Sequence, residues 1–440
     1  MSLSPTRYLE WLHAKCDKIQ TLEKVGKVVQ VAGLLIESHG PDVPVGHIVS
    51  IESDQQDFSI LAEVVGFRDN KVLLMPLEEI NNVHNGCKVI ALSEQSLSPL
   101  GEGLIGRVVD GLGQALDSKG PVRAEYASSV FQPPPNPMKR SMIDTVFETG
   151  VKAIDTFVPI GCGQRIGIFS GSGVGKSTLL GMIAKGGAAD VNVIALIGER
   201  GRELKEFIEH ELGEEGMKKS VVVVSTSDQS PALRLRAAFL ATRIAEDFRD
   251  KGKNVLLLMD SVTRLAMAKR EIGLSVGEPP ASRGYTPSVF SLLPKLLERS
   301  GAGEKGYITA IYTVLVEGDD LNEPVADTVR GILDGHIVLS RQLAVLNHFP
   351  AIDVLESISR LARILLNSEA LNLSYQARDL MALYRKNEDI ITIGAYQKGS
   401  HAAVDRAIDK QPKLMQFLNQ EPDKSYAKEE SWSLLQTTLE

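Results

Sequence analysis

Nine residues near the middle of the chain, SGSGVGKST (170–178), constrain its fold more than any other segment. The apolar run RIGIFS (165–170) leads into them, and the helical pattern LLGMIAK (179–185) follows. A buried strand, a glycine-rich loop and a helix in this order predict a phosphate-binding loop, because glycine lets backbone amides face a phosphate without a Cβ in the way. The start of the following helix adds its positive end. The candidate binding residues are the whole loop: Ser170, Gly171, Ser172, Gly173, Val174, Gly175, Lys176, Ser177 and Thr178.

Two side chains of this loop carry specific chemistry. Lys176 is predicted to reach the β- and γ-phosphates of a bound nucleotide, and the Ser177 hydroxyl is predicted to bind Mg²⁺. The strict pattern GxxxxGK[ST] has Gly where this chain has Ser170, and a small residue is expected to be tolerated there. A chance glycine-rich turn is the alternative, and the flanking strand and helix disfavour it.

Two carboxylates at strand ends extend this prediction to phosphoryl transfer. The buried run VLLLMD ends in Asp260, where a carboxylate at the carboxyl end of a strand holds Mg²⁺ or its water. Glu199 follows the run VNVIALIG and is predicted to polarise the attacking water. Its neighbour Arg200 is expected to orient Glu199 or to bind phosphate. Without the loop, a surface ion pair would be the better interpretation of these two residues.

Arg360, at the end of PAIDVLESISR (350–360), is a candidate for a different role. Phosphoryl transfer needs positive charge on the equatorial oxygens of the transition state, and an arginine at the edge of one subunit can supply it to the next. The local pattern does not decide between this arginine finger and an ordinary solvated helix arginine.

Composition excludes several classes of protein. The chain has 440 residues, of which 43% are hydrophobic, and a net charge of −8; this mixture is typical of a globular chain of about three domains and disfavours a nucleic-acid coat. Three cysteines without a CxxC pair suit a reducing compartment. No run is long and apolar enough to cross a bilayer, and the start lacks a signal-peptide core, so a cytoplasmic location is expected.

The expected fold class is α/β, in four segments. Residues 1–21 predict an amphipathic helix, which either packs on its own domain or docks a partner. Residues 22–94 carry short β-rich runs that predict a small barrel or sandwich. Residues 95–350 contain alternating strand and helix patterns, which predict a mostly parallel sheet covered on both faces. Residues 351–440 read as helical, and their polar last stretch is expected to fray.

Five motifs together resemble the rotary-type ATPase α/β family: SGSGVGKST, LIGERGRE, LLLMDSVTR, GEPPASRGYTPSVF and PAIDVLESIS. The resemblance covers nearly the whole chain in the order of the family. It implies a β-barrel, a RecA-like nucleotide domain, a helical C-terminal domain, and a homohexameric ring with ATP at subunit interfaces. Within the family, LIGERGRELKEFIE and MAKREIGLSVGEPP are most similar to the flagellar type III protein-export ATPases.

This resemblance also implies roles for residues that no local pattern singles out. Arg264, in DSVTR, is implied to contact the γ-phosphate, and Arg360 to act in the site of the neighbouring subunit. Phe349 is implied to pack against adenine, where the family often has Tyr. Tyr396 is implied either to lie near the base or simply to pack. A cis peptide bond is implied between Asp260 and Ser261.

The function implied by the resemblance is Mg-dependent ATP hydrolysis that energises flagellar type III protein export. The implied partners are a peripheral regulator at the N-terminal helix, a coiled-coil stalk protein in the ring pore, export chaperones and substrates, and the membrane export gate; no nucleic acid is expected. The implied location is the inner face of the cytoplasmic membrane. Alternatives are an injectisome secretion ATPase, a catalytic subunit of a proton-coupled ATP synthase, an RNA translocase similar to Rho, and a nucleotide-binding subunit without activity, against which Glu199 argues.

Overall fold

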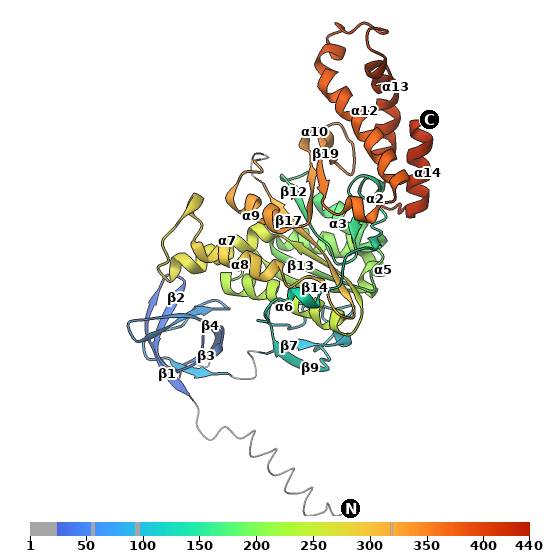
Figure 1. Cartoon of the computed structure of the whole chain (residues 1–440). Coiled ribbons are helices and arrows are strands. Elements are labelled where there is room, and N and C mark those ends of the chain that lie inside the picture. Colours follow the sequence, from blue (N-terminus) through green and yellow to red (C-terminus); the bar gives the residue numbers. More distant parts are fainter. Residues whose placement is uncertain (1–23, 54–57, 93–96, 317, 319) are drawn as a thin grey trace, which may run out of the picture. The chain divides into compact units, whose positions relative to one another are not determined.

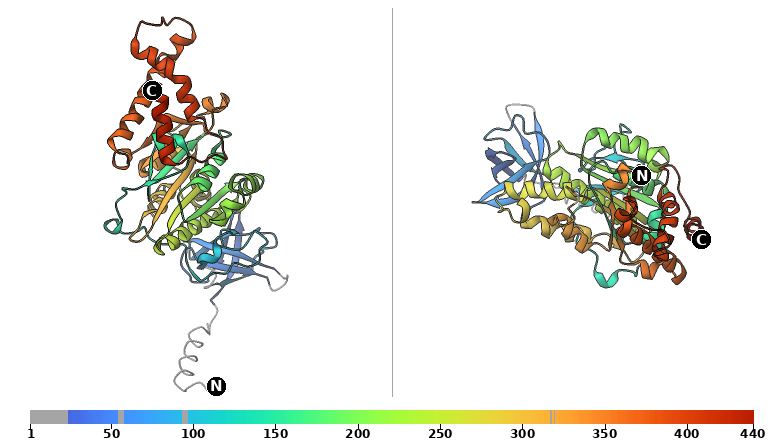
Figure 2. Two further views of the ribbon diagram at one scale, coloured as in Figure 1. Left: turned by 90° about the vertical axis from the view of Figure 1, so that its right-hand side faces the viewer. Right: turned by 90° about the horizontal axis from the view of Figure 1, so that it is seen from above.

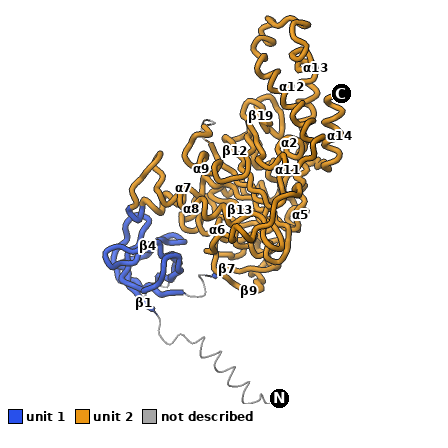
Figure 3. Tube along the Cα trace, in the orientation of Figure 1, with its two compact units in different colours: residues 1–97, 275–277 blue, residues 98–274, 278–440 orange. Residues whose placement is uncertain are grey.

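The computed structural model describes residues 24–53, 58–92, 97–316, 318 and 320–440. The predicted helix in residues 1–21, and its predicted role in docking a partner, lie outside these residues. The chain forms two compact units: one comprises residues up to 97 together with 275–277, and the other comprises 98–274 and 278–440 (Figure 3). Among the described residues, no helix has both the length and the apolar character needed to cross a membrane.

The first unit is a closed six-stranded barrel with the strand order β1-β2-β5-β4-β3-β6 (Figure 1). All its strand pairs are antiparallel. Apolar side chains that alternate along the strands fill the interior, among them Val28, Ile36, Val49, Ile51 and Leu74. The barrel alternative is therefore confirmed over the sandwich. Its strands are β1 Val25–Ala32, β2 Leu35–His39, β3 Ile48–Glu52, β4 Ser59–Arg68, β5 Lys71–Pro76 and β6 Lys88–Ala91.

The second unit is built on a nine-stranded sheet in the order β19-β18-β12-β17-β15-β13-β14-β8, with β16 paired to β17. The strands from β18 to β8 are parallel, as predicted. They are nearly continuous apolar runs because the sheet is buried, and α6 (Pro231–Asp250) packs across β13, β14, β15 and β17. The strands are β8 Val108–Val109, β12 Arg165–Ser170, β13 Val191–Glu199, β14 Ser220–Thr226, β15 Asn254–Asp260, β16 Gly301–Ala302, β17 Tyr307–Leu315, β18 Gly335–Leu339 and β19 Ile352–Ser359.

Strand β19 corrects the prediction that the chain becomes helical at 351. It runs antiparallel to β18 at the edge of the sheet. Ile352, Val354 and Ser357 are buried, whereas Glu356 and Ile358 are exposed. The apolar pattern of this segment also suits a helix, so its pairing with β18 is what makes it a strand.

The C-terminal region is helical from residue 362 onward, with a long hairpin of α12 and α13 (Figure 2). The last helix, α14, carries buried Leu435 and Leu439, which corrects the expectation that the chain frays there. The helices of the second unit are α2 Lys152–Phe157, α3 Lys176–Gly186, α4 Gly201–Glu206, the π-helix η3 Phe207–Leu212, α5 Gly213–Lys218, α6, α7 Val262–Ser275, α8 Pro287–Leu297, α9 Pro324–Ile332, α10 Arg341–Val345, α11 Ala362–Leu365, α12 Ser368–Thr392, α13 Ala402–Leu418 and α14 Lys428–Leu439.

Candidate nucleotide-binding site

The glycine-rich loop joins β12 to α3 as the sequence predicts. Ser170 is the last residue of the strand and Lys176 the first of the helix. Gly173 and Gly175 have φ values of 77° and 84°, which side-chain-bearing residues rarely adopt. Val174 is buried beneath the loop. This backbone turns the amides of the loop and of the first helical turn toward one point, as phosphate binding requires.

A cavity of about 790 Å³ opens above the loop. A volume of this size suits a nucleotide-sized ligand. Its lining includes most of the loop and charged residues from several other parts of the chain: Ser170, Gly171, Ser172, Gly173, Gly175, Lys176, Ser177, Thr178, Glu199, Arg200, Glu203, Arg264, Arg270, Arg283, Glu323 and Arg341.

Lys176, Asp260 and Glu199 meet at the base of this cavity, because β12, β15 and β13 are parallel and end at the same edge. Lys176 Nζ donates a hydrogen bond to Asp260 Oδ1 and lies 3.7 Å from Glu199 Oε1. The Thr313 hydroxyl on β17 also donates to Asp260 Oδ1, at 2.7 Å. The three predicted residues are thus brought together by strands far apart in sequence.

The oxygen donors of the site suit Mg²⁺. The Asp260 carboxylate and the Ser177 hydroxyl are hard ligands, and Mg²⁺ commonly takes one or two protein oxygens and completes its shell with water and phosphate. No group of three or more His, Cys, Asp or Glu side chains in the described part of the chain could hold a metal by itself.

Glu199 is placed to act on a water molecule. It is the last residue of β13, its side chain is 15% exposed, and its Oε1 atom makes no hydrogen bond. Burial raises the pKa of Glu199, and the nearby Asp260 charge adds to this rise, while Lys176 and Arg264 oppose it. A largely buried carboxylate that lines a nucleotide-sized cavity and has a raised pKa has the features of a general base or water-orienting group.

Several arginines line the cavity, and they differ in exposure and in their partners. Arg264, on α7, lines the cavity, and its buried Nε atom makes no hydrogen bond within the described part of the chain. Arg200 is largely exposed and pairs with Glu203 at 3.3 Å. Sequence reasoning missed Glu203, which lies in α4 and lines the cavity together with Glu199. The predicted cis peptide between Asp260 and Ser261 is present.

Of the three remaining predicted residues, Phe349 lies at the glycine-rich loop, whereas Tyr396 and Arg360 do not. Phe349 lies against the loop, since a Cβ on Gly175 would be 3.4 Å from its ring. Tyr396 lies in the loop between α12 and α13, where its hydroxyl donates to Asp405 at 2.9 Å, and it does not line the cavity. Arg360 follows β19, at the edge of the sheet opposite its own glycine-rich loop, and its guanidinium donates to the carbonyl of Arg330 at 3.3 Å.

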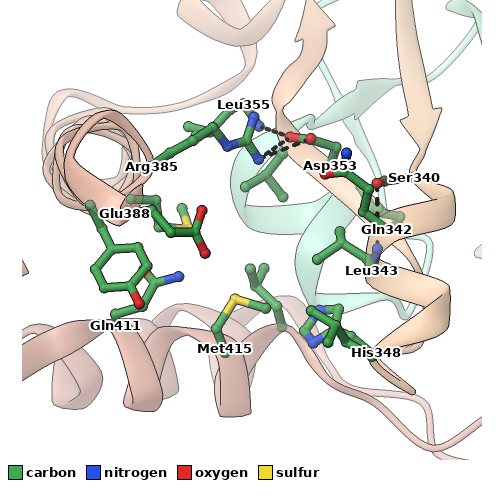
Figure 4. Close-up of a pocket in the computed structure, with 16 residues that line it drawn as sticks. Ser340, Gln342, Leu343, His348, Asp353, Leu355, Arg385, Glu388, Gln411 and Met415 are labelled. Atoms are coloured by element: carbon green, nitrogen blue, oxygen red, sulfur yellow. Dashed lines mark hydrogen bonds and ion pairs between the residues drawn. The ribbon is translucent and has the colours of Figure 1, made fainter. Parts of the chain in front are cut away.

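A second, smaller cavity of about 150 Å³ lies between β19, α10 and the hairpin of α12 and α13. Arg385 on α12 donates to both carboxylate oxygens of Asp353 on β19, at 3.0 and 2.9 Å, across this space (Figure 4). His348 and Met415 also line it. The ion pair fastens the helical region to the strand that leads to Arg360.

The sequence models of the nucleotide-binding domain and the beta-barrel domain of the ATP synthase alpha/beta family match residues 150–359 and 28–93. The model of the T3SS EscN ATPase C-terminal domain matches residues 366–437.

Similarity to individual proteins covers nearly the whole chain. The flagellum-specific ATP synthase of Bacillus subtilis is 54% identical over 95% of this chain and 96% of its own length. The type 3 secretion system ATPase of Xanthomonas euvesicatoria is 47% identical over 94% and 93%. Two structures of the assembled ATPase EscN of enteropathogenic E. coli, without and with its central stalk EscO, match at TM-scores of 0.90 and 0.87. Both are 44% identical and cover 94% of this chain and all of theirs.

Proposed function

The chain belongs to the ATP synthase alpha/beta family, in the branch that holds the flagellum-specific and type 3 secretion ATPases, and from this we propose that it is the ATPase of a flagellar export apparatus. It hydrolyses ATP, and the hydrolysis is coupled to protein export. The observation that carries the proposal is the meeting of Lys176, Asp260 and Glu199 above the glycine-rich loop.

The proposed mechanism assigns one task to each group. The loop amides and Lys176 bind the β- and γ-phosphates. Ser177 and Asp260 would hold Mg²⁺, which would neutralise phosphate charge when bound. Glu199 orients water for in-line attack on the γ-phosphorus and accepts its proton. Arg264 contacts the γ-phosphate, and the Phe349 ring packs against adenine. Arg200, which pairs with Glu203 at 3.3 Å, either orients Glu199 or binds phosphate.

We propose that Arg360 acts in the site of a neighbouring subunit. Ser359 pairs with Gly335 at the start of β18, whereas the glycine-rich loop follows Ser170, which pairs with Leu339 at the end of that strand. Four residues of strand separate these levels by about 13 Å. Arg360 therefore lies at the wrong edge of the sheet for its own nucleotide, and an arginine finger from this position requires an adjacent copy, as in a homohexameric ring.

The flagellar assignment is favoured over its alternatives by two findings. The identity to the Bacillus subtilis flagellar protein is 54%, against 47% for the Xanthomonas secretion ATPase. The C-terminal helices match the T3SS ATPase model, which disfavours a proton-coupled ATP synthase subunit. An injectisome ATPase is the second candidate, since its relatives share most of the chain.

The proposed partners follow from the relatives. EscN has been solved with its central stalk EscO, which supports a coiled-coil stalk in the pore of a ring of this chain. We propose further that a peripheral regulator binds the N-terminal segment. Export chaperones and their substrates, and the export gate at the cytoplasmic face of the membrane, would complete the assembly. There the ATPase releases and unfolds substrates.

Specific ATPase activity measured against protein concentration, with Arg360→Ala alongside, tests the proposal. Activity per subunit is expected to rise steeply as the chain assembles, and the variant is expected to stay low at every concentration. Activity per subunit that stays constant down to concentrations where only monomer is present would show a self-contained site and overturn the shared one.

A further inference from the structure

The segment that follows Glu199 contacts the end of the glycine-rich loop, and this contact has no part in the proposed mechanism. After β13 the chain forms α4, the π-helix η3 and α5 before it enters β14. Glu211, near the end of η3, accepts a hydrogen bond from the Thr178 hydroxyl at 2.8 Å. Thr178 lies in the first turn of α3, two residues after Lys176.

The backbones of α3 and η3 also approach closely beside this hydrogen bond. A Cβ on Gly181 would lie 2.9 Å from both the Cβ and the carbonyl oxygen of Glu211, so only glycine fits there. Gly181 is three residues after Thr178, and the two positions therefore share one face of α3. Glu211 packs against this face along a full turn of the helix.

The π-helical turn explains how Glu211 reaches α3. Leu212, the next residue, is fully buried in the core together with Phe207. In an α-helix consecutive residues point about 100° apart, whereas a π turn contains extra backbone and shifts the register of the residues that follow. Single π turns occur frequently at functional sites. Here the turn coincides with Glu211 facing Thr178 and Leu212 entering the core.

We propose that Glu211 is a positioning residue for hydrolysis: through Thr178, it holds the segment that follows Glu199 in register with the glycine-rich loop. The inference rests on the proposed ATPase function. The Thr178 hydroxyl has a single proton, and it is committed to Glu211, so the role of this side chain is to fasten α3 to η3. Nucleotide binding uses the loop amides, Lys176 and Ser177 and does not depend on this bond.

The position of Glu199 relative to the γ-phosphate does depend on it. Glu199 ends β13, and α4 begins two residues later, so a shift of η3 along α3 moves the backbone that fixes the carboxylate. Small displacements of a catalytic group lower the rate of the chemical step more than they weaken substrate binding.

Steady-state ATPase kinetics of Glu211→Ala, Glu211→Gln and Thr178→Val test this role. Glu211→Ala and Thr178→Val are each expected to lower kcat about three- to tenfold, with the KM for ATP and the affinity for a fluorescent ATP analogue changed less than about twofold. Glu211→Gln keeps an acceptor oxygen and is expected to restore most of the activity. The double variant Glu211→Ala with Thr178→Val is expected to be no slower than either single variant.

Glu209→Ala is the matched control, since Glu209 lies on the same π-helix and makes only an exposed ion pair with Lys205 at 3.6 Å among the contacts described. It is expected to keep wild-type kcat. Wild-type kcat in both Glu211→Ala and Thr178→Val, additive losses in the double variant, or a loss that appears only in KM would each overturn the inference. Failure of the wild-type chain to hydrolyse ATP would instead overturn the proposed function.

Discussion

At the scale of single residues, the carboxylates of Asp260 and Glu199 have different surroundings. Asp260 accepts hydrogen bonds from Lys176 and Thr313. Glu199 has a buried oxygen without a hydrogen bond and a pKa raised first by burial and then by Asp260. A carboxylate held by two donors is suited to binding a metal ion, whereas burial raises the proton affinity of Glu199 and suits it to accepting a proton.

Glu199→Gln is expected to lower kcat by about 10²- to 10⁴-fold, because an amide cannot accept the proton of the attacking water. Affinity for a fluorescent ATP analogue with Mg²⁺ is expected to stay within about twofold, since the phosphate contacts come from the loop. Steady-state ATPase assays measure kcat, and fluorescence titration measures the affinity for the ATP analogue. Glu206→Gln, on the exposed side of α4, is the control. Hydrolysis at the wild-type rate in Glu199→Gln would remove Glu199 from the mechanism.

The raised pKa of Glu199 predicts the acid limb of the pH profile. The carboxylate must be ionised to accept a proton, so kcat is expected to fall as the pH drops through the pKa of Glu199. Because burial raises this pKa above the ordinary value of 4.5, the fall begins at a higher pH than an exposed glutamate would give. The measurement is kcat against pH at saturating MgATP, with circular dichroism to establish that the fold is intact. An acid loss confined to pH values below 4.5 would contradict this assignment.

At the scale of elements, the end of β13 carries a local irregularity that directs Glu199. The pairing of β13 with β14 shifts between Ile197 and Glu199, so Gly198 is an extra residue in the strand. Gly198 has a φ of 70°, and a Cβ there would lie 2.9 Å from the Cβ of Arg264. The bulge therefore brings Glu199 and Arg264 to the same part of the cavity and admits only glycine.

Gly198→Ala is expected to destabilise the protein by about 1–3 kcal/mol through its backbone conformation, and to lower kcat about tenfold or more by displacing Glu199 or Arg264. The midpoint of thermal unfolding and steady-state ATPase kinetics measure the two effects. Gly201→Ala is the matched control, because a Cβ there meets no atom within 4 Å and alanine favours the start of α4. Equal unfolding midpoints and equal kcat values in Gly198→Ala and Gly201→Ala would show that the bulge does not position the site.

At the scale of the whole molecule, the direction of β19 is the feature with the largest consequence. This strand is antiparallel to β18, so the chain leaves the sheet at the edge opposite the glycine-rich loop and exposes Arg360 there. The Arg385–Asp353 ion pair ties the C-terminal helices to the same strand (Figure 4). Movements of these helices are therefore expected to reach Arg360 and Phe349, which flank β19.

Mixing Glu199→Gln with Arg360→Ala tests whether a site is shared between chains. Each variant alone is expected to be nearly inactive. In randomly mixed rings, about a quarter of the interfaces combine an intact Glu199 with an intact Arg360 from the neighbour, so about a quarter of wild-type activity is expected to return. The ATPase activity of the mixture is measured after the two variants have assembled together. A mixture no more active than its better component would contradict the shared site.

The parts of this protein that depend on local pattern could be predicted from its amino-acid sequence alone. The glycine-rich loop between β12 and α3, the strands that deliver Asp260 and Glu199, and the short strands of the first unit all follow from residue spacing and apolar periodicity, because short-range sterics and burial fix such elements. The choice between a barrel and a sandwich for those strands came from their pairing. Recognition of the family motifs added the cis bond after Asp260 and the place of Phe349. Only the tertiary structure decided three further features: that 352–359 is a strand and not a helix, that Glu211 reaches Thr178, and that Tyr396 lies away from the loop. Each depends on a partner distant in sequence, and a local pattern carries no information about which distant residue will satisfy it.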